Sequence, residues 1–240
     1  MPPTTPSAAA NNTVRFDDIR PWLLAQTPET LATLLLEASA DNDRLRKRLL
    51  ILTSTAAGKP PDLTPFRDFI NRAIEVSGFV NWDEMNDYTA GIYDIAAILT
   101  ELVAGNQAAS AKELAEYAFS LLNGALFNRI YDQGELSIAM DWLFSAHEKA
   151  CRSLKTDPVE LAQYLYDLEI NDDFGYYDGI ARHYTGLLGA DGAQRLKALA
   201  RKTLENDSST KGRKNTAKTI LRNIALAEND TETLAALEAV

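Results

Sequence analysis

Apolar residues recur along this chain at steps of three and four positions, which is the spacing of one face of an α-helix. The clearest stripe begins near Trp82 and comprises Met85, Tyr88, Ile92, Ile95, Leu99 and Leu102. Gly105 and Asn106 follow it, and both residue types are typical of a helix end. The pattern therefore predicts a helix of about 20 residues that buries one side.

Two further stripes predict the next two helices. The first comprises Leu114, Ala118, Leu121 and Ala125. After Gly134 comes the second, which comprises Leu136, Met140, Leu143, His147 and Cys151. Because only a few residues connect these helices, we expect them to pack as antiparallel neighbours.

Three short polar residues, each followed by proline, mark helix starts at Thr27-Pro28, Thr64-Pro65 and Asp157-Pro158. The polar side chain can accept a hydrogen bond from the first turn, and proline fits the first helical position. Shorter stripes predict further helices around residues 31–38 and 45–52, and at roughly 158–170, 179–188, 191–205, 213–228 and 230–239.

The sequence contains no convincing strand, because apolar and polar positions do not alternate over any run longer than about four residues. No fixed period relates one part of the chain to another. We therefore expect an all-α fold of about ten to twelve helices, stacked as antiparallel pairs into a bundle or a short irregular α-solenoid. Residues 15–240 are expected to form a single all-helical domain. Residues 1–14, rich in Pro, Thr, Ala and Asn, are expected to form a disordered tail.

The composition excludes several classes of protein. The single cysteine, Cys151, excludes an intramolecular disulfide and a zinc site made of cysteines. No apolar run approaches the ~18 residues of a membrane span, and the first residues lack the features of a signal peptide. We therefore expect a soluble, cytoplasmic protein with no membrane partner.

Charge is distributed unevenly along the chain, whose formal net charge is −10. Residues 81–180 contain 18 Asp and Glu against 5 Lys and Arg, whereas residues 195–222 contain 9 Lys and Arg against 2 acidic residues. This asymmetry favours different partners for two surfaces, or attraction between them. Two solvated helix faces that carry opposite net charge and bind no ligand would give the same pattern.

The sequence has no catalytic motif: it lacks a nucleophile elbow, a Gly-rich phosphate loop and a pair of histidines flanking a glutamate on a helix. We therefore assign no catalytic and no cofactor-binding residue. His147 and Cys151 stand one helical turn apart and could offer two metal ligands, but His183 is the only other histidine. Because both residues continue an apolar stripe, we interpret them as a buried pair and assign no metal ligand.

The densest acidic cluster spans residues 167–178, at a helix end and in the following loop. It comprises Asp167, Glu169, Asn171, Asp172, Asp173 and Asp178. Alternating oxygen ligands are typical of a calcium loop, but Asp172 stands where an EF-hand turn needs glycine, and residues 167 and 169 point in different directions on a helix. The two interpretations are a calcium or magnesium site, and a loop held by Asx turns with Gly175 and Gly179 at its bends.

Two basic clusters could contact phosphate groups. One comprises Arg44, Arg46, Lys47 and Arg48, and the other is the segment 195–222. Neither alternates basic residues with exposed aromatic residues as single-strand binders do. An isoelectric point near 4.8 also lacks the basic footprint of a dedicated nucleic-acid protein, so we do not expect nucleic acid to be the partner.

Three stretches carry a resemblance to a known family: Leu23–Leu50 (LLAQTPETLATLLLEASADNDRLRKRLL), Phe79–Leu102 (FVNWDEMNDYTAGIYDIAAILTEL) and Asp157–Tyr177 (DPVELAQYLYDLEINDDFGYY). The chain resembles an uncharacterised bacterial all-helical family of unknown function, related to the helical regions of SWIM-type zinc-finger proteins. The resemblance implies an all-helical fold and assigns no functional residue. A nucleic-acid role is implied by the association with SWIM-type proteins, although one cysteine does not supply their zinc site.

These observations favour a non-enzymatic helical protein-interaction module with an unidentified protein partner, in which a partner segment docks along a groove between helix pairs. The first alternative is an accessory nucleic-acid-binding protein that uses the segment 195–222. The second alternative is a metal-dependent enzyme that uses the acidic loop 167–178.

Overall fold

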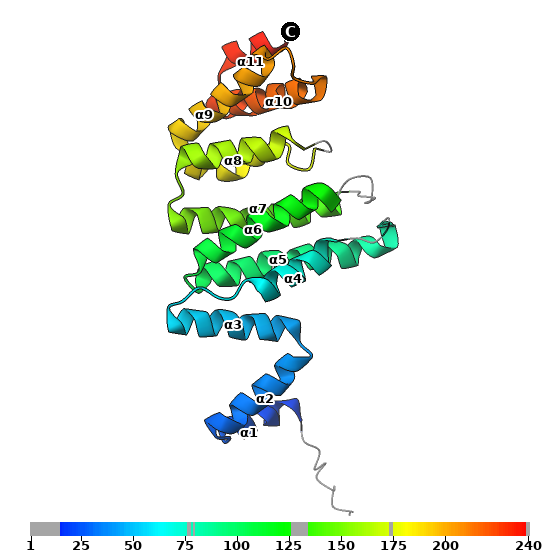
Figure 1. Ribbon diagram of the computed structural model, residues 1–240, viewed down its shortest axis with the longest axis vertical. Helices are drawn as coiled ribbons and strands as arrows, with labels where there is room; N and C mark the ends of the chain where they lie inside the picture. The colour runs from blue at the N-terminus through cyan, green and yellow to red at the C-terminus, as the bar shows by residue number, and fades with distance from the viewer. Residues whose placement is uncertain (1–14, 76–77, 79, 126–133, 173–174, 239–240) are drawn as a thin grey trace, which may run out of the picture. The chain divides into compact units, whose positions relative to one another are not determined.

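The structure is a computed structural model that describes residues 15–75, 78, 80–125, 134–172 and 175–238 (Figure 1). Over these residues the chain forms eleven α-helices, three short 3-10 helices and no β-strand. The predicted all-α fold and the predicted number of helices are thereby confirmed. The tail predicted for residues 1–14 lies outside the described residues, and the single domain expected over residues 15–240 stays a prediction.

Contacts between residues divide the chain into two compact units, one up to Arg46 and one from Lys47 onward. The first unit contains the 3-10 helix η1 (Phe16–Asp18), α1 (Ile19–Leu24), α2 (Pro28–Ala40) and the first residues of α3 (Asp43–Ala57). Thr27 caps α2, because its hydroxyl accepts a hydrogen bond from the Thr30 N–H at 3.2 Å. The helix start predicted at Thr27-Pro28 is therefore confirmed.

The second unit contains the other helices of the described chain. They are the remainder of α3, α4 (Thr64–Ile74), the 3-10 helix η2 (Trp82–Glu84), α5 (Met85–Ala104), α6 (Ala108–Ala125), α7 (Glu135–Leu154), α8 (Pro158–Ile170), the 3-10 helix η3 (Ile180–Tyr184), α9 (Thr185–Glu205), α10 (Lys211–Glu228) and α11 (Thr231–Glu238). Helices that are close in sequence pack together: α5 against α6 and α7, α8 against α9, and α10 against α9 and α11 (Figure 1). No described helix is both long and apolar enough to cross a membrane.

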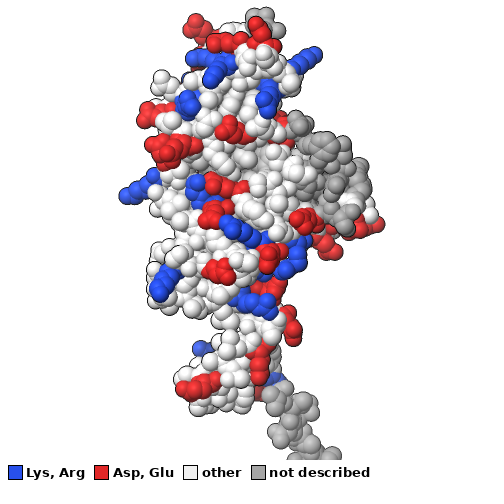
Figure 2. All heavy atoms as spheres, in the orientation of Figure 1, with Lys and Arg blue, Asp and Glu red and all other residues white. Residues whose placement is uncertain are grey.

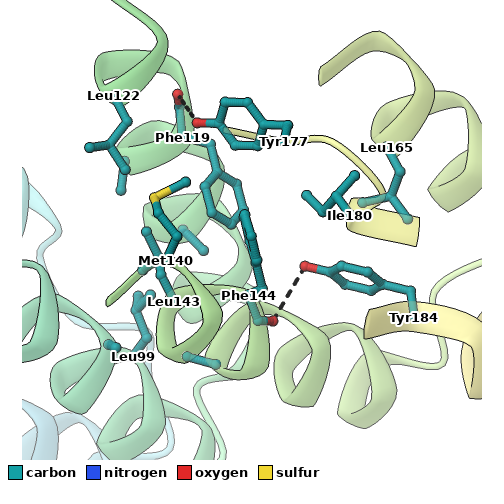
Figure 3. Packing of buried hydrophobic residues seen from close by; sticks show 14 of the residues in the cluster. Leu99, Phe119, Leu122, Met140, Leu143, Phe144, Leu165, Tyr177, Ile180 and Tyr184 are labelled. Carbon is teal, nitrogen blue, oxygen red and sulfur yellow. Dashed lines mark hydrogen bonds between the residues drawn. The ribbon is translucent and has the colours of Figure 1, made fainter. Parts of the chain in front are cut away.

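The core of this unit follows the apolar stripes of the sequence. All six residues of the stripe on α5 are buried, and Leu99 is completely inaccessible. The stripe on α7, including His147 and Cys151, is buried as well. Figure 3 shows Leu99 in the same core as Phe119 of α6 and Phe144 of α7, whose ring centroids lie 5.5 Å apart. The spacing rule therefore identified the buried faces of α5 and α7 correctly. On α6, Leu114 and Ala118 of the predicted stripe are buried and Leu121 is half-buried, while the burial of Ala125 lies outside the described residues.

Two tyrosines attach residues 175–184 to this core. The Tyr177 hydroxyl donates a hydrogen bond to the Phe119 carbonyl at 2.9 Å, and the Tyr184 hydroxyl donates one to the Phe144 carbonyl at 3.3 Å (Figure 3). Both tyrosine side chains are completely buried. These contacts hold Gly179 and η3 in place beside α8 and α9, where the candidate site lies.

The helix starts predicted at Asp157-Pro158 and Thr64-Pro65 are both present, but the capping role expected of Thr64 was wrong. Asp157 caps α8 as expected, and its carboxylate accepts the N–H groups of Val159 and Glu160 at 2.9 and 3.0 Å. Thr64, however, is the first residue of α4, and its N–H donates to the Asp62 carboxylate at 2.9 Å. An acceptor two residues earlier thus takes the role predicted for the threonine.

Of the helices predicted at residues 179–188 and 191–205, only the first differs in the structure, because it begins as a 3-10 helix. Residues 180–184 form η3, and α9 continues from Thr185 to Glu205 through a bend at Gly189. The Gly189 backbone has φ 52° and ψ −156°, a conformation that is open almost only to glycine. The break expected between residues 188 and 191 is therefore confirmed at Gly189, where two helical segments meet.

Candidate functional site

An apolar pocket of about 300 Å³ lies between α8, α9 and α10 of the second unit. Leu188, Ala193 and Leu196 of α9 face Ile220 and Ile224 of α10 across it. The volume is at the lower end of the range of about 300 to 1,000 Å³ that is usual for ligand pockets. The pocket is therefore large enough for one side chain or a small molecule.

Two glycines shape the helix that forms one wall of the pocket. Gly192 lets α9 approach α8 closely, since a Cβ atom there would lie 2.8 Å from the Leu188 side chain and 3.0 Å from the Pro158 carbonyl oxygen. Gly189 lines the pocket itself and provides the bend described above. A Cβ atom at Gly189 would meet no atom within 4 Å, so the glycine is required there by its backbone conformation.

A buried carboxylate from α8, Glu169, borders the pocket. Its side chain is 2% exposed, and Oε1 accepts the Gly179 N–H at 2.8 Å. Burial raises the pKa of Glu169 from 4.5 to about 7, while the hydrogen bond from Gly179 and the charge of Arg182 oppose the increase. The Asp178 and Asp172 carboxylates raise this pKa further. Near neutral pH the side chain is thus divided between its charged and neutral forms.

Gly179 and Arg182 complete the polar border. Gly179 has φ 72°, and a Cβ atom there would come within 2.6 to 2.9 Å of the Arg182 guanidinium. The Arg182 Nε–H donates to the Gly179 carbonyl at 3.3 Å. Glycine at this position therefore allows its N–H to reach Glu169 and its carbonyl to hold the exposed arginine. On the opposite side, Glu228 of α10 lines the pocket and forms an ion pair with Lys197 of α9.

The acidic cluster of residues 167–178 does not converge on one point. Asp167 is exposed and accepts hydrogen bonds from Gln163 at 3.0 Å, whereas Glu169 is buried. Asp172 accepts the Tyr177 N–H at 2.6 Å, and Asp173 lies outside the described residues. Among the residues described, no three His, Cys, Asp or Glu side chains come close enough together to hold a metal ion. The choice between a calcium or magnesium site and a loop held by Asx turns stays a prediction, as does the metal-dependent enzyme.

His147 and Cys151 belong to a buried polar cluster in α7. The His147 Nδ1 atom lies 2.8 Å from the Tyr184 hydroxyl, and Nε2 lies 3.4 Å from the Cys151 sulfur and 3.7 Å from Glu116 Oε1. Burial lowers the pKa of His147, which favours the neutral ring, and raises the pKa of Cys151 to about 11. A thiol of this kind is a poor nucleophile. His183 lies elsewhere, with its Nε2 atom 3.3 Å from Asp141.

The basic segment 195–222 forms most of α9 and α10, and several of its charged groups contact neighbouring helices. Arg195 donates to Gln163 at 2.7 Å, Arg213 donates to Asn171 at 2.6 Å, and Lys197 pairs with Glu228. Figure 2 shows basic and acidic side chains intermixed on the visible face of the second unit. Of the earlier basic cluster, Lys47 is buried, with its ammonium 4.0 Å from the centroid of the Phe69 ring. These arrangements form no continuous basic surface on that face.

The pocket was not predicted from the sequence, although the acidic cluster and the basic segment, which both contribute to it, were identified there as candidate sites. Glu169 belongs to the acidic cluster, and Leu196 and Ile220 belong to the basic segment. One signal was available: Glu169 follows the buried residues Leu161 and Leu165 at intervals of four, so it occupies the apolar stripe of α8. A carboxylate within a buried stripe indicates either a satisfied interior group or a binding site.

The chain belongs to the family of unknown function DUF6880, because the model of that family matches residues 22–239. The match confirms the resemblance to a family of unknown function, and it does not bear on the expected relation to SWIM-type zinc-finger proteins. Comparisons with curated proteins and with solved structures found no match.

Proposed function

We propose that this member of the family is a non-enzymatic protein-interaction module, and that the pocket between α8, α9 and α10 receives an anchor side chain from a partner segment. The observation that supports the proposal is the apolar wall formed by Leu188, Leu196, Ile220 and Ile224 around a space of about 300 Å³. Stacked helix pairs commonly bind extended or helical segments in the grooves between them. One side chain in a well-packed pocket can supply much of the binding energy of such an interface.

The residues around the pocket favour binding over catalysis. The described residues that line it include no His, Cys, Ser, Tyr or Lys, so the usual nucleophiles and nitrogen bases are not among them. Thr185 has no base of this kind beside it among the lining residues. Glu169 is the one lining group with a strongly raised pKa, and the other lining carboxylate, Glu228, is already paired with Lys197. A carboxyl group without a free second reacting partner is better suited to recognition.

A pocket-filling variant tests this proposal. Ala193 is half-buried and lines the pocket, whereas Ala198 is exposed on the same helix. Ala193→Phe should fill the space, and Ala198→Phe adds the same side chain away from the pocket. Thermal melting first establishes that both variants are folded.

Partners recovered from cell lysate with the wild-type protein and with Ala198→Phe should be lost with Ala193→Phe. Each candidate partner is then purified and titrated directly by calorimetry, and we expect Ala193→Phe to weaken binding by at least about tenfold, which is about 1.4 kcal/mol. If no partner distinguishes the two variants, the pocket is not the docking site.

A further inference from the structure

We propose that the anchor received by this pocket is a lysine side chain of the partner segment, with its aliphatic stem against the apolar wall and its ammonium group paired with the Glu169 carboxylate. This inference rests on the proposed function, since it names the residue that the partner supplies. Two observations carry it: the carboxylate is almost completely buried, and it borders a pocket whose other walls are mostly apolar.

The Glu169 carboxylate lacks a partner that matches its charge. The one hydrogen bond that the described residues give it comes from the neutral Gly179 N–H. A carboxylate offers about four acceptor sites on its two oxygens, and the Gly179 N–H occupies one of them. A buried charge is stable only when it is paired or well hydrogen-bonded, and a cation from a ligand would provide that pairing.

Lysine matches both parts of the pocket. Its four methylene groups cover apolar surface while the ammonium group remains at the end of the stem. In this pocket the stem would contact residues such as Leu188 and Ile224, and the head would lie at Glu169. A purely aliphatic side chain would leave the carboxylate unpaired, and an acidic one would place a second negative charge beside it.

The charged groups around Glu169 also favour a cation. Asp172 and Asp178 lie in the segment after α8, and both carboxylates act on Glu169. Glu228 lines the pocket from α10 and is paired with Lys197. Arg182 of η3 opposes the acidic groups, and water screens its charge as it screens that of Asp178, since both side chains are exposed. The lining residues contributed by α9 are uncharged. A bound ammonium group thus meets an excess of negative charge.

Binding should depend on pH in a defined direction. The ammonium group pairs only with the ionised form of Glu169, whose pKa is about 7 in the unliganded protein. Affinity should therefore fall as the pH decreases from 8 to 5.5, and binding near pH 7 should release protons from the protein. Asp172, Asp178 and Glu228 are present in every variant tested, so their contributions are shared, and the contribution of Arg182 is tested by its own substitution.

The experiment uses small probes that share one stem and differ in the head group: n-pentylamine, 1-pentanol and pentanoate. Binding to the full chain is followed by nuclear magnetic resonance at pH 8 and pH 5.5, with signals from α9 and α10 reporting on the pocket. We expect the amine to bind about tenfold or more tightly than the alcohol at pH 8, as is usual for a hydrogen bond to a charged group. Glu169→Gln should abolish this preference. Arg182→Gln should retain or increase it.

The outcomes separate the two proposals. If the alcohol binds as tightly as the amine, or pentanoate binds best, the lysine assignment is wrong and the pocket remains a docking site. If none of the probes binds the wild-type protein while all signals show a folded chain, the pocket itself is not a binding site and the proposed function fails.

A second comparison tests the source of the ammonium group. A capped pentapeptide with a central lysine is compared with the same peptide containing norleucine at that position. We expect the lysine peptide to bind at least as tightly as n-pentylamine and about tenfold more tightly than the norleucine peptide. Binding of the amine without binding of the lysine peptide would show that the occupant is a free amine, and would overturn the assignment to a partner protein.

Discussion

Glu169→Gln should stabilise the folded protein, and the gain should increase as the pH rises. Glutamine has the size of glutamate, and its amide oxygen can accept the Gly179 N–H in place of Oε1. The substitution therefore removes the buried charge while keeping the hydrogen bond. The difference in the free energy of unfolding between the two proteins therefore measures the effect of that charge on stability.

The magnitude follows from the pKa of this group in the two states. Burial raises it from 4.5 to about 7, so the folded state binds the proton more tightly than the unfolded state. Stability from this group is fully present below about pH 4.5 and is lost as the pH rises through about 7. At about 1.4 kcal/mol for each pKa unit, the loss is about 3 kcal/mol. Because only 2% of the residue is exposed, solvent screening reduces this figure little.

Urea unfolding monitored by circular dichroism at 222 nm, from pH 4 to pH 8, measures the effect in both proteins. The stability of Glu169→Gln relative to the wild-type protein should increase by about 3 kcal/mol over this range. Asp167→Asn, on the exposed side of the same helix, controls for the general removal of a carboxylate from α8. A relative stability that stays constant within about 0.5 kcal/mol would show that the Glu169 carboxyl is solvated in the folded state.

Three further predictions concern the rest of the second unit. Leu99→Ala should lower the free energy of unfolding by about 2 to 5 kcal/mol, measured by urea denaturation, because it leaves a cavity in the core. Gly192→Ala should destabilise by about 1 to 3 kcal/mol, since the added methyl group meets the Pro158 carbonyl; a gain in stability would mean that α8 and α9 are farther apart. Cys151 should react with a thiol reagent only after unfolding, because it is buried and its pKa is raised to about 11; rapid reaction in native buffer would contradict this.

The helices could be predicted well because their signals are local. The stripe from Met85 to Leu102 needs only the 3.6-residue period of a helix, and all of its members are buried. The cap at Asp157 depends on atoms two and three residues away. Where the prediction failed, at the cap of α4, a nearby alternative was available: Asp62 accepts the hydrogen bond from the first turn of that helix.

The candidate site could be predicted only in part, because its groups come from three helices. The sequence places Glu169 on the buried stripe of α8, but it does not show that α9 and α10 leave a space beside it. His147 is a similar case. Its position on an apolar stripe predicts burial, whereas its partner Tyr184, at 2.8 Å, comes from a segment 37 residues later. Contacts at such separations depend on the tertiary arrangement, which periodicity does not encode.

The buried polar groups of the second unit differ in their hydrogen-bond partners. This difference distinguishes the groups that stabilise the fold from the group that we propose binds a partner. His147 and Tyr184 are neutral partners within hydrogen-bond distance of each other and join α7 to η3. Tyr177 donates to the Phe119 carbonyl and joins the segment before η3 to α6. Glu169 instead retains a carboxylate that lowers stability at neutral pH and has one neutral donor. A side chain that destabilises the folded protein is expected at a position where it contributes to binding. If Glu169→Gln both stabilises the protein and removes the preference for an amine, the carboxylate serves recognition. If it stabilises the protein without changing amine binding, the carboxylate contributes neither to folding nor to the proposed interaction.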